Sequence, residues 1–141
     1  MRRISGESGM ALVETLLLGL LLLMPLIWGL SVLSELHRAA LATTAAAREA
    51  GFDAARATSA SDAQRRIDAA VARAFADHGL DPSEGSVEWT SPGFDRGGEV
   101  EIRVSYATPV LQAPFLGSVS GPSISVAARH VARVDPYRSR P

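Results

Sequence analysis

The residue in this sequence that most needs a chemical explanation is Glu14, an acid inside an apolar segment. That segment covers residues 10–33, and Glu14 is its only ionisable residue. A charged side chain deep in a bilayer costs about 2.5 to 3.5 kcal/mol on insertion scales, and less near the interface. A carboxylate in this position therefore indicates a functional role, and it needs a partner.

A free amino group just before Glu14 would supply that partner. If a peptidase cuts after Gly9, Met10 becomes the new N-terminus and Glu14 the fifth residue of the mature chain. An α-amino group is cationic below a pKa of about 7.7 to 8.0. The Met10 amine of one subunit could then neutralise Glu14 of a neighbour. Because burying either charge alone is costly, such a pair favours in-register packing of helices.

No other set of residues has the spacing of a catalytic or metal site. His37, His78 and His130 fall in separate predicted elements, and each is interpreted as a surface or edge residue. The segment Gly117-Ser118-Val119-Ser120-Gly121 has its serines in the wrong place for a nucleophile elbow. We therefore predict no catalytic residue, no bound metal and no cofactor.

An acidic turn and the overall composition narrow the partners further. Asp81, Glu84 and Glu88 surround a turn and could hold a cation, but a solvated acidic loop is the favoured interpretation. The absence of cysteine excludes disulfides and zinc-thiolate sites. A formal net charge of -1, without a basic patch, gives no reason to expect a nucleic-acid partner. The sequence also contains no phosphate-binding loop, and we expect no small-molecule substrate.

The residues around Glu14 resemble the processing junction of type IV pilins and pseudopilins. The segment Gly9-Met10-Ala11-Leu12-Val13-Glu14 places a glycine before the cut and a glutamate fifth after it, as in that family. With Gly6-Glu7-Ser8 upstream and a leucine run containing Pro25 downstream, the wider segment is similar to the TadE-like proteins of tight-adherence (Flp-type) pilus systems. The resemblance is close over residues 2 to about 38 and looser beyond them.

This resemblance implies a structural, non-catalytic role as a minor pseudopilin or pilus assembly protein. It implies that residues 1–9 are a prepilin-type leader, removed by a dedicated prepilin peptidase. The other implied partners are pilins or pseudopilins, the pilus assembly platform and membrane lipid. Major Flp pilins are usually much shorter, so the size of the segment beyond residue 38 favours the TadE-like class.

A second hypothesis has no connection with pili. In it, the chain is a single-pass, signal-anchored envelope protein that carries an extracytoplasmic binding or interaction module. Glu14 would then lie shallow, at the cytoplasmic interface. A third hypothesis, an exported enzyme, has little support because no site can be assembled from the residues above.

The element that must position Glu14 is a transmembrane helix over residues 10–33. A hydrocarbon core about 30 Å thick needs about 20 helical residues, and the run 16–30 is apolar throughout. Arg2 and Arg3 precede it, which predicts a cytoplasmic N-terminus and an extracytoplasmic C-terminal domain. The expected location is the bacterial cytoplasmic membrane, with possible incorporation into a surface pilus. Pro25 removes a backbone donor and predicts a helix kink.

A secretory signal peptide is the competing interpretation of the same segment. Ala40-Leu41-Ala42 resembles a signal-peptidase site, which would give a mature chain starting near Thr43. The apolar region of a signal peptide is usually about 7 to 15 residues long, and the run found here is longer. The sequence therefore favours a retained anchor.

The rest of the chain predicts an α+β fold. The transmembrane helix is expected to continue outward as a solvated helical stem over residues 34–56, with Gly51 as a helix-ending glycine. Ser61 is expected to cap a second helix over residues 62–78, which Gly79 ends. One face of the stem is expected to carry Leu33, Leu36, Ala40, Leu41 and Ala47. The apolar face of the second helix is expected to carry Ile67, Ala70, Val71, Ala74 and Phe75.

Three antiparallel strands are predicted after the second helix, over residues 86–89, 99–108 and 123–134. In the middle strand Val100, Ile102, Val104 and Tyr106 alternate with polar residues, as in a half-buried strand. In the last strand the inward residues are expected to be Ile124, Val126, Ala128, His130, Ala132 and Val134. We expect these strands to form a meander that packs on the second helix. Residues 62–134 then form one outer domain, and 135–141 a tail.

Overall fold

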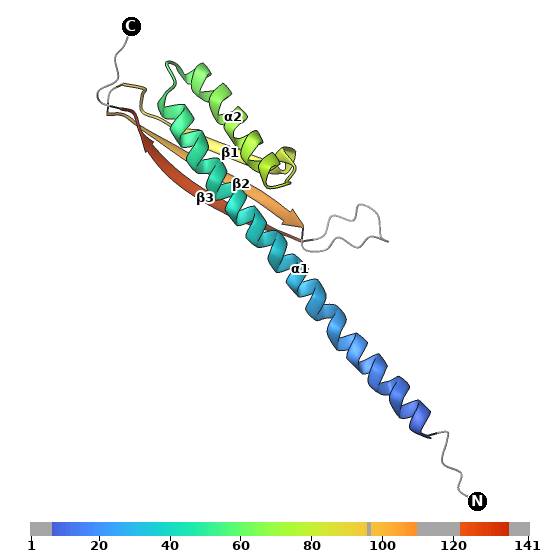
Figure 1. Ribbon diagram of the computed structural model, residues 1–141. Coiled ribbons are helices and arrows are strands. Elements are labelled where there is room, and N and C mark those ends of the chain that lie inside the picture. The colour runs from blue at the N-terminus through green and yellow to red at the C-terminus, as the bar shows by residue number, and fades with distance from the viewer. Residues whose placement is uncertain (1–6, 96, 110–121, 136–141) are drawn as a thin grey trace, which may run out of the picture. The chain divides into compact units, whose positions relative to one another are not determined.

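The structure is a computed structural model of the chain and describes residues 7–95, 97–109 and 122–135. It confirms the predicted α+β class (Figure 1). The elements are α1 (Glu7–Ala55), α2 (Ala60–Asp77), the short 3-10 helix η1 (Pro82–Glu84), β1 (Gly85–Thr90), β2 (Glu99–Pro109) and β3 (Ser123–Arg133). The chain divides into an N-terminal unit, Met1–Ser34, and a C-terminal unit, Glu35–Pro141.

The described part of the N-terminal unit is the first half of α1, and apart from Glu14 and a few hydroxyl residues its exposed side chains are apolar. From Gly9 to Ser34 every side chain is exposed except Val32, which is partly buried. By length and composition this helix could cross a membrane, a property that a signal sequence near an N-terminus shares. The helix continues through Pro25 as a single element. The kink at Pro25 stays a prediction.

In the C-terminal unit the three strands form an antiparallel meander in the order β1-β2-β3. The central strand, β2, buries Val100, Ile102, Val104, Tyr106 and Thr108 and turns its charged residues outward. This alternation confirms the predicted inner face. Strand boundaries differ from the predicted ones by one residue at most ends.

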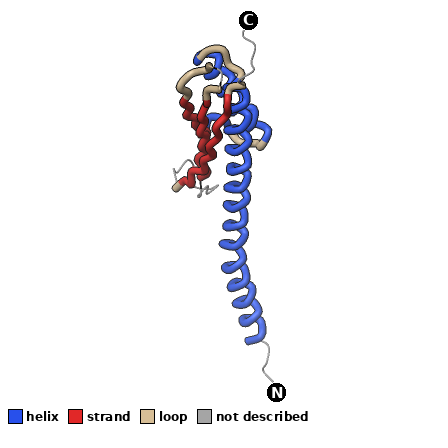
Figure 2. The backbone as a smooth tube through the Cα atoms, turned by 90° about the vertical axis from the view of Figure 1, so that its left-hand side faces the viewer, coloured by secondary structure: helices blue, strands red, loops and turns tan. Residues whose placement is uncertain are grey.

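Two helices cover one face of this sheet (Figure 2). Helix α2 lies over β1, because Phe75 contacts Gly85 and the Trp89 indole donates to the Gln64 side chain at 2.7 Å. The second half of α1 lies over β3, where His130 and Ala132 approach Gly51. The Arg73–Asp53 ion pair, at 3.2 Å, joins the two helices.

The prediction that residues 34–56 form a solvated stem is wrong, because one face of this helix is part of the core. Leu33 and Leu41, predicted on the packed face, are 63% and 51% exposed. Of the residues predicted on this face, Ala47 alone is fully buried. The other buried side chains of this part of the helix are Ala39, Ala42, Thr43, Ala46, Ala50 and Ala54. Alanine places little side chain between a helix and a sheet, so the two backbones can approach closely.

Gly51 does not end the helix, as had been predicted, since α1 continues to Ala55. A Cβ atom added at Gly51 would lie 2.6 Å from the His130 ring and 3.3 Å from the Ala132 methyl. The glycine is therefore explained by a close helix–sheet contact. Because Gly51 lies inside the helix, the ability of glycine to adopt a helix-ending conformation is not required at this position.

Helix α2 begins earlier than predicted. Ser59, and not Ser61, is the N-cap residue, and its hydroxyl accepts a hydrogen bond from the Asp62 amide at 3.2 Å. Gly79 follows the helix with φ of 67°, a left-handed conformation that suits glycine. The predicted apolar face is confirmed, because its five residues Ile67, Ala70, Val71, Ala74 and Phe75 are all buried.

Candidate functional site

Glu14 lies near the start of α1 with an exposed side chain. Within the part of the chain that the structure describes, it makes no hydrogen bond and no ion pair. The adjacent hydroxyl of Thr15 donates instead to the carbonyl of Ala11, at 2.8 Å. Ser31, further along, also bonds back to its own helix. The hydroxyls of this apolar segment are therefore satisfied internally, and its one carboxylate is not.

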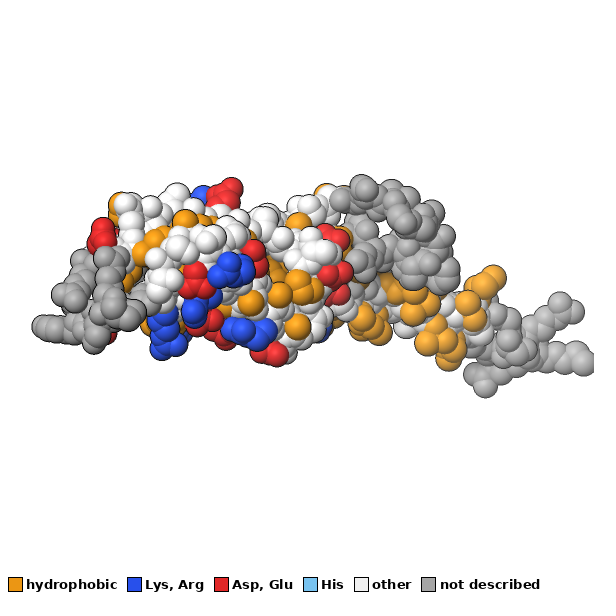
Figure 3. Space-filling model, turned by 90° about the horizontal axis from the view of Figure 1, so that it is seen from above, with side chains coloured by type: hydrophobic (Ala, Val, Ile, Leu, Met, Phe, Trp, Pro, Cys, Tyr) orange, Lys and Arg blue, Asp and Glu red, His pale blue; other side chains and the backbone are white. Residues whose placement is uncertain are grey.

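The surroundings of Glu14 are apolar. Val13, Leu17 and Leu18 are each at least 59% exposed, so within the described residues little shields them or the carboxylate. Figure 3 shows hydrophobic side chains along this part of α1 and charged ones gathered over the C-terminal unit. If this surface enters lipid, the carboxylate must be neutralised by a proton or by a cation from outside the described chain.

The predicted cleavage junction, Gly9–Met10, falls in the first turn of α1. Met10 is 73% exposed, and a Cβ added at Gly9 would meet no atom within 4 Å. The first four amides of a helix have no intrahelical acceptor, so this turn is the easiest to unwind for a peptidase. Met10 and Glu14 are four residues apart and therefore share a helix face.

Arg2 and Arg3, the predicted orientation signal, lie outside the described residues, as does the segment 117–121. The tail is described only to Asp135.

The three histidines do not meet in the C-terminal unit. His37 is exposed, the His78 ring bonds the Ala74 carbonyl at 2.8 Å, and His130 packs 5.6 Å from the Phe52 ring. Among the residues that the structure describes, no three His, Cys, Asp or Glu side chains are grouped so that they could hold a metal ion.

Asp81, considered above as part of a cation site, stabilises the turn before β1. Its carboxylate accepts hydrogen bonds from the Ser83 amide at 2.9 Å and from the Ser83 hydroxyl at 2.8 Å. These bonds lower the pKa of Asp81. The carboxylate therefore caps η1, which is a structural role.

The exposed face of the sheet carries an acid–base ladder that the sequence showed only as a polar face. Arg129 on β3 donates to Glu101 on β2 at 2.7 Å, and Arg133 donates to Glu99 at 3.0 Å. The hydrogen bond from Arg129 to the Glu101 carboxylate raises the pKa of Arg129. An antiparallel register puts such residues opposite or diagonal to each other, but strand spacing alone could not reveal that register.

A hollow of about 230 Å³ lies on the same face, lined by Glu88, Trp89, Thr90, Glu101 and Arg103. The hollow is open, and its lining contains Arg103 as well as the acids Glu88 and Glu101. This arrangement does not favour a bound cation.

No protein-family model, curated protein or solved structure matches this chain. A functional conclusion therefore has to come from the residues and geometry above.

Proposed function

We propose that this chain is a TadE-like minor pseudopilin or pilus assembly protein, structural and non-catalytic. The observation that carries the proposal is Glu14, a carboxylate on an apolar helix with no partner among the described residues, at the fifth position after Gly9. Cleavage after Gly9 would create a cationic amine on Met10. The amine of a neighbouring pilin or pseudopilin, or of a second copy, would then pair with Glu14.

The pairing explains both why the acid is present and why it stands where it does. A carboxylate alone in hydrocarbon is unfavourable, and an ammonium alone is equally so. Together, two helices at matched depth satisfy both groups, and a mismatch in depth leaves both unsatisfied. Glu14 would thus set the depth at which a neighbouring helix packs. An ordinary anchor has no such requirement.

The proposed location follows from the same helix. The span would cross the bacterial cytoplasmic membrane once, with the N-terminus in the cytoplasm and the C-terminal unit outside. A prepilin peptidase would remove residues 1–9, and the assembly platform would receive the mature chain. The alternative is a plain signal-anchor carrying a binding module. It predicts no cut after Gly9.

Substitution of Gly9 tests the proposal. Gly9→Val should block cleavage, so that the membrane fraction contains only the full-length chain. Gly19→Val is the matched control, because a Cβ at either glycine would meet no atom within 4 Å. That control should be processed like the wild-type chain. The readout is the intact mass of the chain purified from membranes of cells that contain a prepilin peptidase. A Gly9→Val chain cut after residue 9, or a Gly19→Val chain left at full length, would refute the proposed junction.

A further inference from the structure

The hairpin formed by β2 and β3 is charged at one end and uncharged at the other. Residues 104–128 contain no Asp, Glu, Lys or Arg, whereas elsewhere in residues 35–141 the longest such run is 39–47. The structure describes residues 104–109 and 122–128 of the uncharged run, and the register pairs these two parts with each other. The charged residues of the hairpin all lie in its other half: Glu99, Glu101, Arg103, Arg129 and Arg133.

The uncharged end lies where α1 enters the C-terminal unit. Strand β3 and the second half of α1 run in the same direction (Figure 1), and Gly51 lies against Ala132 near the far end of both. Eight residues of β3, from position 131 back to Ser123, extend about 26 Å at about 3.3 Å per residue. The same length of helix holds about 18 residues, which leads from Gly51 back to the start of the unit, near Glu35.

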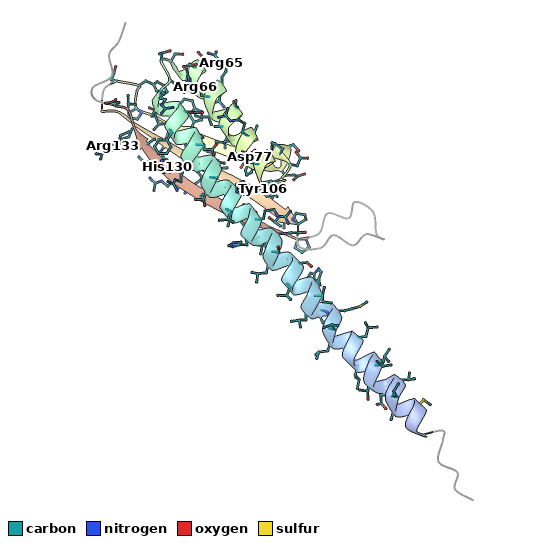
Figure 4. All side chains as sticks on the ribbon, viewed as in Figure 1. Arg65, Arg66, Asp77, Tyr106, His130 and Arg133 are labelled. Atoms are coloured by element: carbon teal, nitrogen blue, oxygen red, sulfur yellow. The ribbon has the colours of Figure 1, made fainter. Side chains whose placement is uncertain are left out.

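The side chains show the same order along the sheet. Figure 4 shows Arg133 and His130 toward the end of the sheet where α1 ends, and Tyr106 further toward the other end. Glu35, the first residue of the C-terminal unit, directly follows the apolar segment and Ser34 in the chain. Chain connectivity therefore keeps the uncharged end close to any membrane that residues 10–33 cross.

Apolar surface is left open at this uncharged end. Along β3 the inward side chains become more exposed toward its start, since Ala132 is 5% exposed, Val126 is partly buried and Ile124 is 44% exposed. The outward residues of this half are all small: Ser105, Ala107, Ser123, Ser125 and Ala127. Such a surface leaves water at low cost, because no ion has to be desolvated.

We propose that the uncharged end of the hairpin rests on the lipid surface of the membrane that residues 10–33 cross. Glu35 is two residues beyond that segment, a rise of about 3 Å along the helix. The headgroup region extends about 5 to 7 Å beyond the hydrocarbon core on each side. An end level with Glu35 therefore falls within the headgroup region. The exposed side chains of Glu35, His37 and Arg38 fit that level, which is polar.

A second protein is the alternative occupant of this surface. Lipid fits better, because charge is absent from both strands and from both the inward and the outward side, whereas a docked protein would cover one side. The contact would limit the tilt of the C-terminal unit over the membrane. The inference rests on the membrane crossing in the proposed function, and it does not require cleavage after Gly9 or pilus assembly.

Fluorescence quenching by lipid tests this contact. Single cysteines are introduced as Ser123→Cys or Val131→Cys, since the natural chain has none. Both residues are exposed on the outward side of β3, about 26 Å apart. The full-length chains carry an environment-sensitive fluorophore in vesicles of phosphatidylethanolamine and phosphatidylglycerol, at a density that leaves chains isolated. A nitroxide on the lipid headgroup should quench the label at position 123 and leave the label at 131 bright.

A label in the apolar segment separates this inference from the proposed anchor. Leu23→Cys, in the middle of residues 10–33, should be quenched by a nitroxide deep in the acyl chains. Quenching at position 23 without quenching at 123 would overturn the lipid contact and leave the anchor intact. If position 23 also escapes quenching, the membrane crossing fails and the contact fails with it.

A charge variant distinguishes contact from mere proximity. Ser125→Glu adds a charge beside Ser123 on the same side of β3, and it should lower the quenching of the label at 123. Thr90→Glu, in the charged half of the sheet, is the matched control and should leave that quenching unchanged. Circular dichroism of each variant verifies the fold. Equal quenching at positions 123 and 131, or full quenching at 123 in the Ser125→Glu chain, would overturn the inference.

Discussion

At the scale of single residues, the proposed function depends on the carboxylate of Glu14 and on the peptide bond between Gly9 and Met10. Both could be identified from the sequence, because an acid in an apolar run and a glycine five positions before it are visible without a fold. The partner of Glu14 could not be identified in this way. It does not lie in the described chain, where neighbouring hydroxyls bond to their own helix.

Replacement of Glu14 should separate anchoring from assembly. Glu14→Ala should insert and be cleaved normally, because removing a charge from an apolar segment favours insertion. It should fail to enter a pilus or to co-purify with its pilin partner, because the Met10 amine of the neighbour would lose its counter-charge. Pilus yield and co-purification from membranes are the measurements.

The control for this variant is Glu35→Ala, which removes another exposed acid of α1 in the C-terminal unit. It should assemble normally. If Glu14→Ala also assembles normally, Glu14 does not act through pairing.

At the scale of elements, the sequence predicted the buried face where large apolar residues recur periodically. It did not predict the buried face of an alanine-rich helix. The alternation in β2 and the 3.6-residue repeat in α2 each identify a buried face, because large apolar residues mark it. In the second half of α1 the large residue Leu41 is exposed and six alanines are buried. Alanine occurs readily on either face of a helix. Only the contact with the sheet showed which alanines pack.

Gly51 is the position where that packing is tightest. Gly51→Val should destabilise the C-terminal unit by about 1–3 kcal/mol, the usual cost of overpacking a core. The reason is that the new side chain would meet His130 and Ala132. Thermal unfolding of the purified full chain in detergent, followed by circular dichroism, measures the effect.

His130→Ala provides the coupled test for Gly51. In its presence Gly51→Val should cost less, because residues in contact give non-additive effects. If the two substitutions are additive, the close contact between α1 and β3 does not limit the packing.

At the scale of the whole molecule, the sequence predicted the α+β class, a helix long and apolar enough to cross a membrane, and a three-stranded meander. Short connections between consecutive strands favour that order. The sequence also predicted that the helix continues beyond the apolar segment, but not that its second half packs on the sheet as part of the core. Leucines mark the first half of α1, but its second half carries no pattern that identifies a core helix.

The central claim is that this chain is processed like a pilin, and the mass of the mature protein tests it most directly. Intact-mass spectrometry of the wild-type chain, purified from membranes that contain a prepilin peptidase, should show residues 10–141, beginning at Met10. A chain that still begins at Met1, or one that begins near Thr43 after signal-peptidase cleavage, would contradict the account.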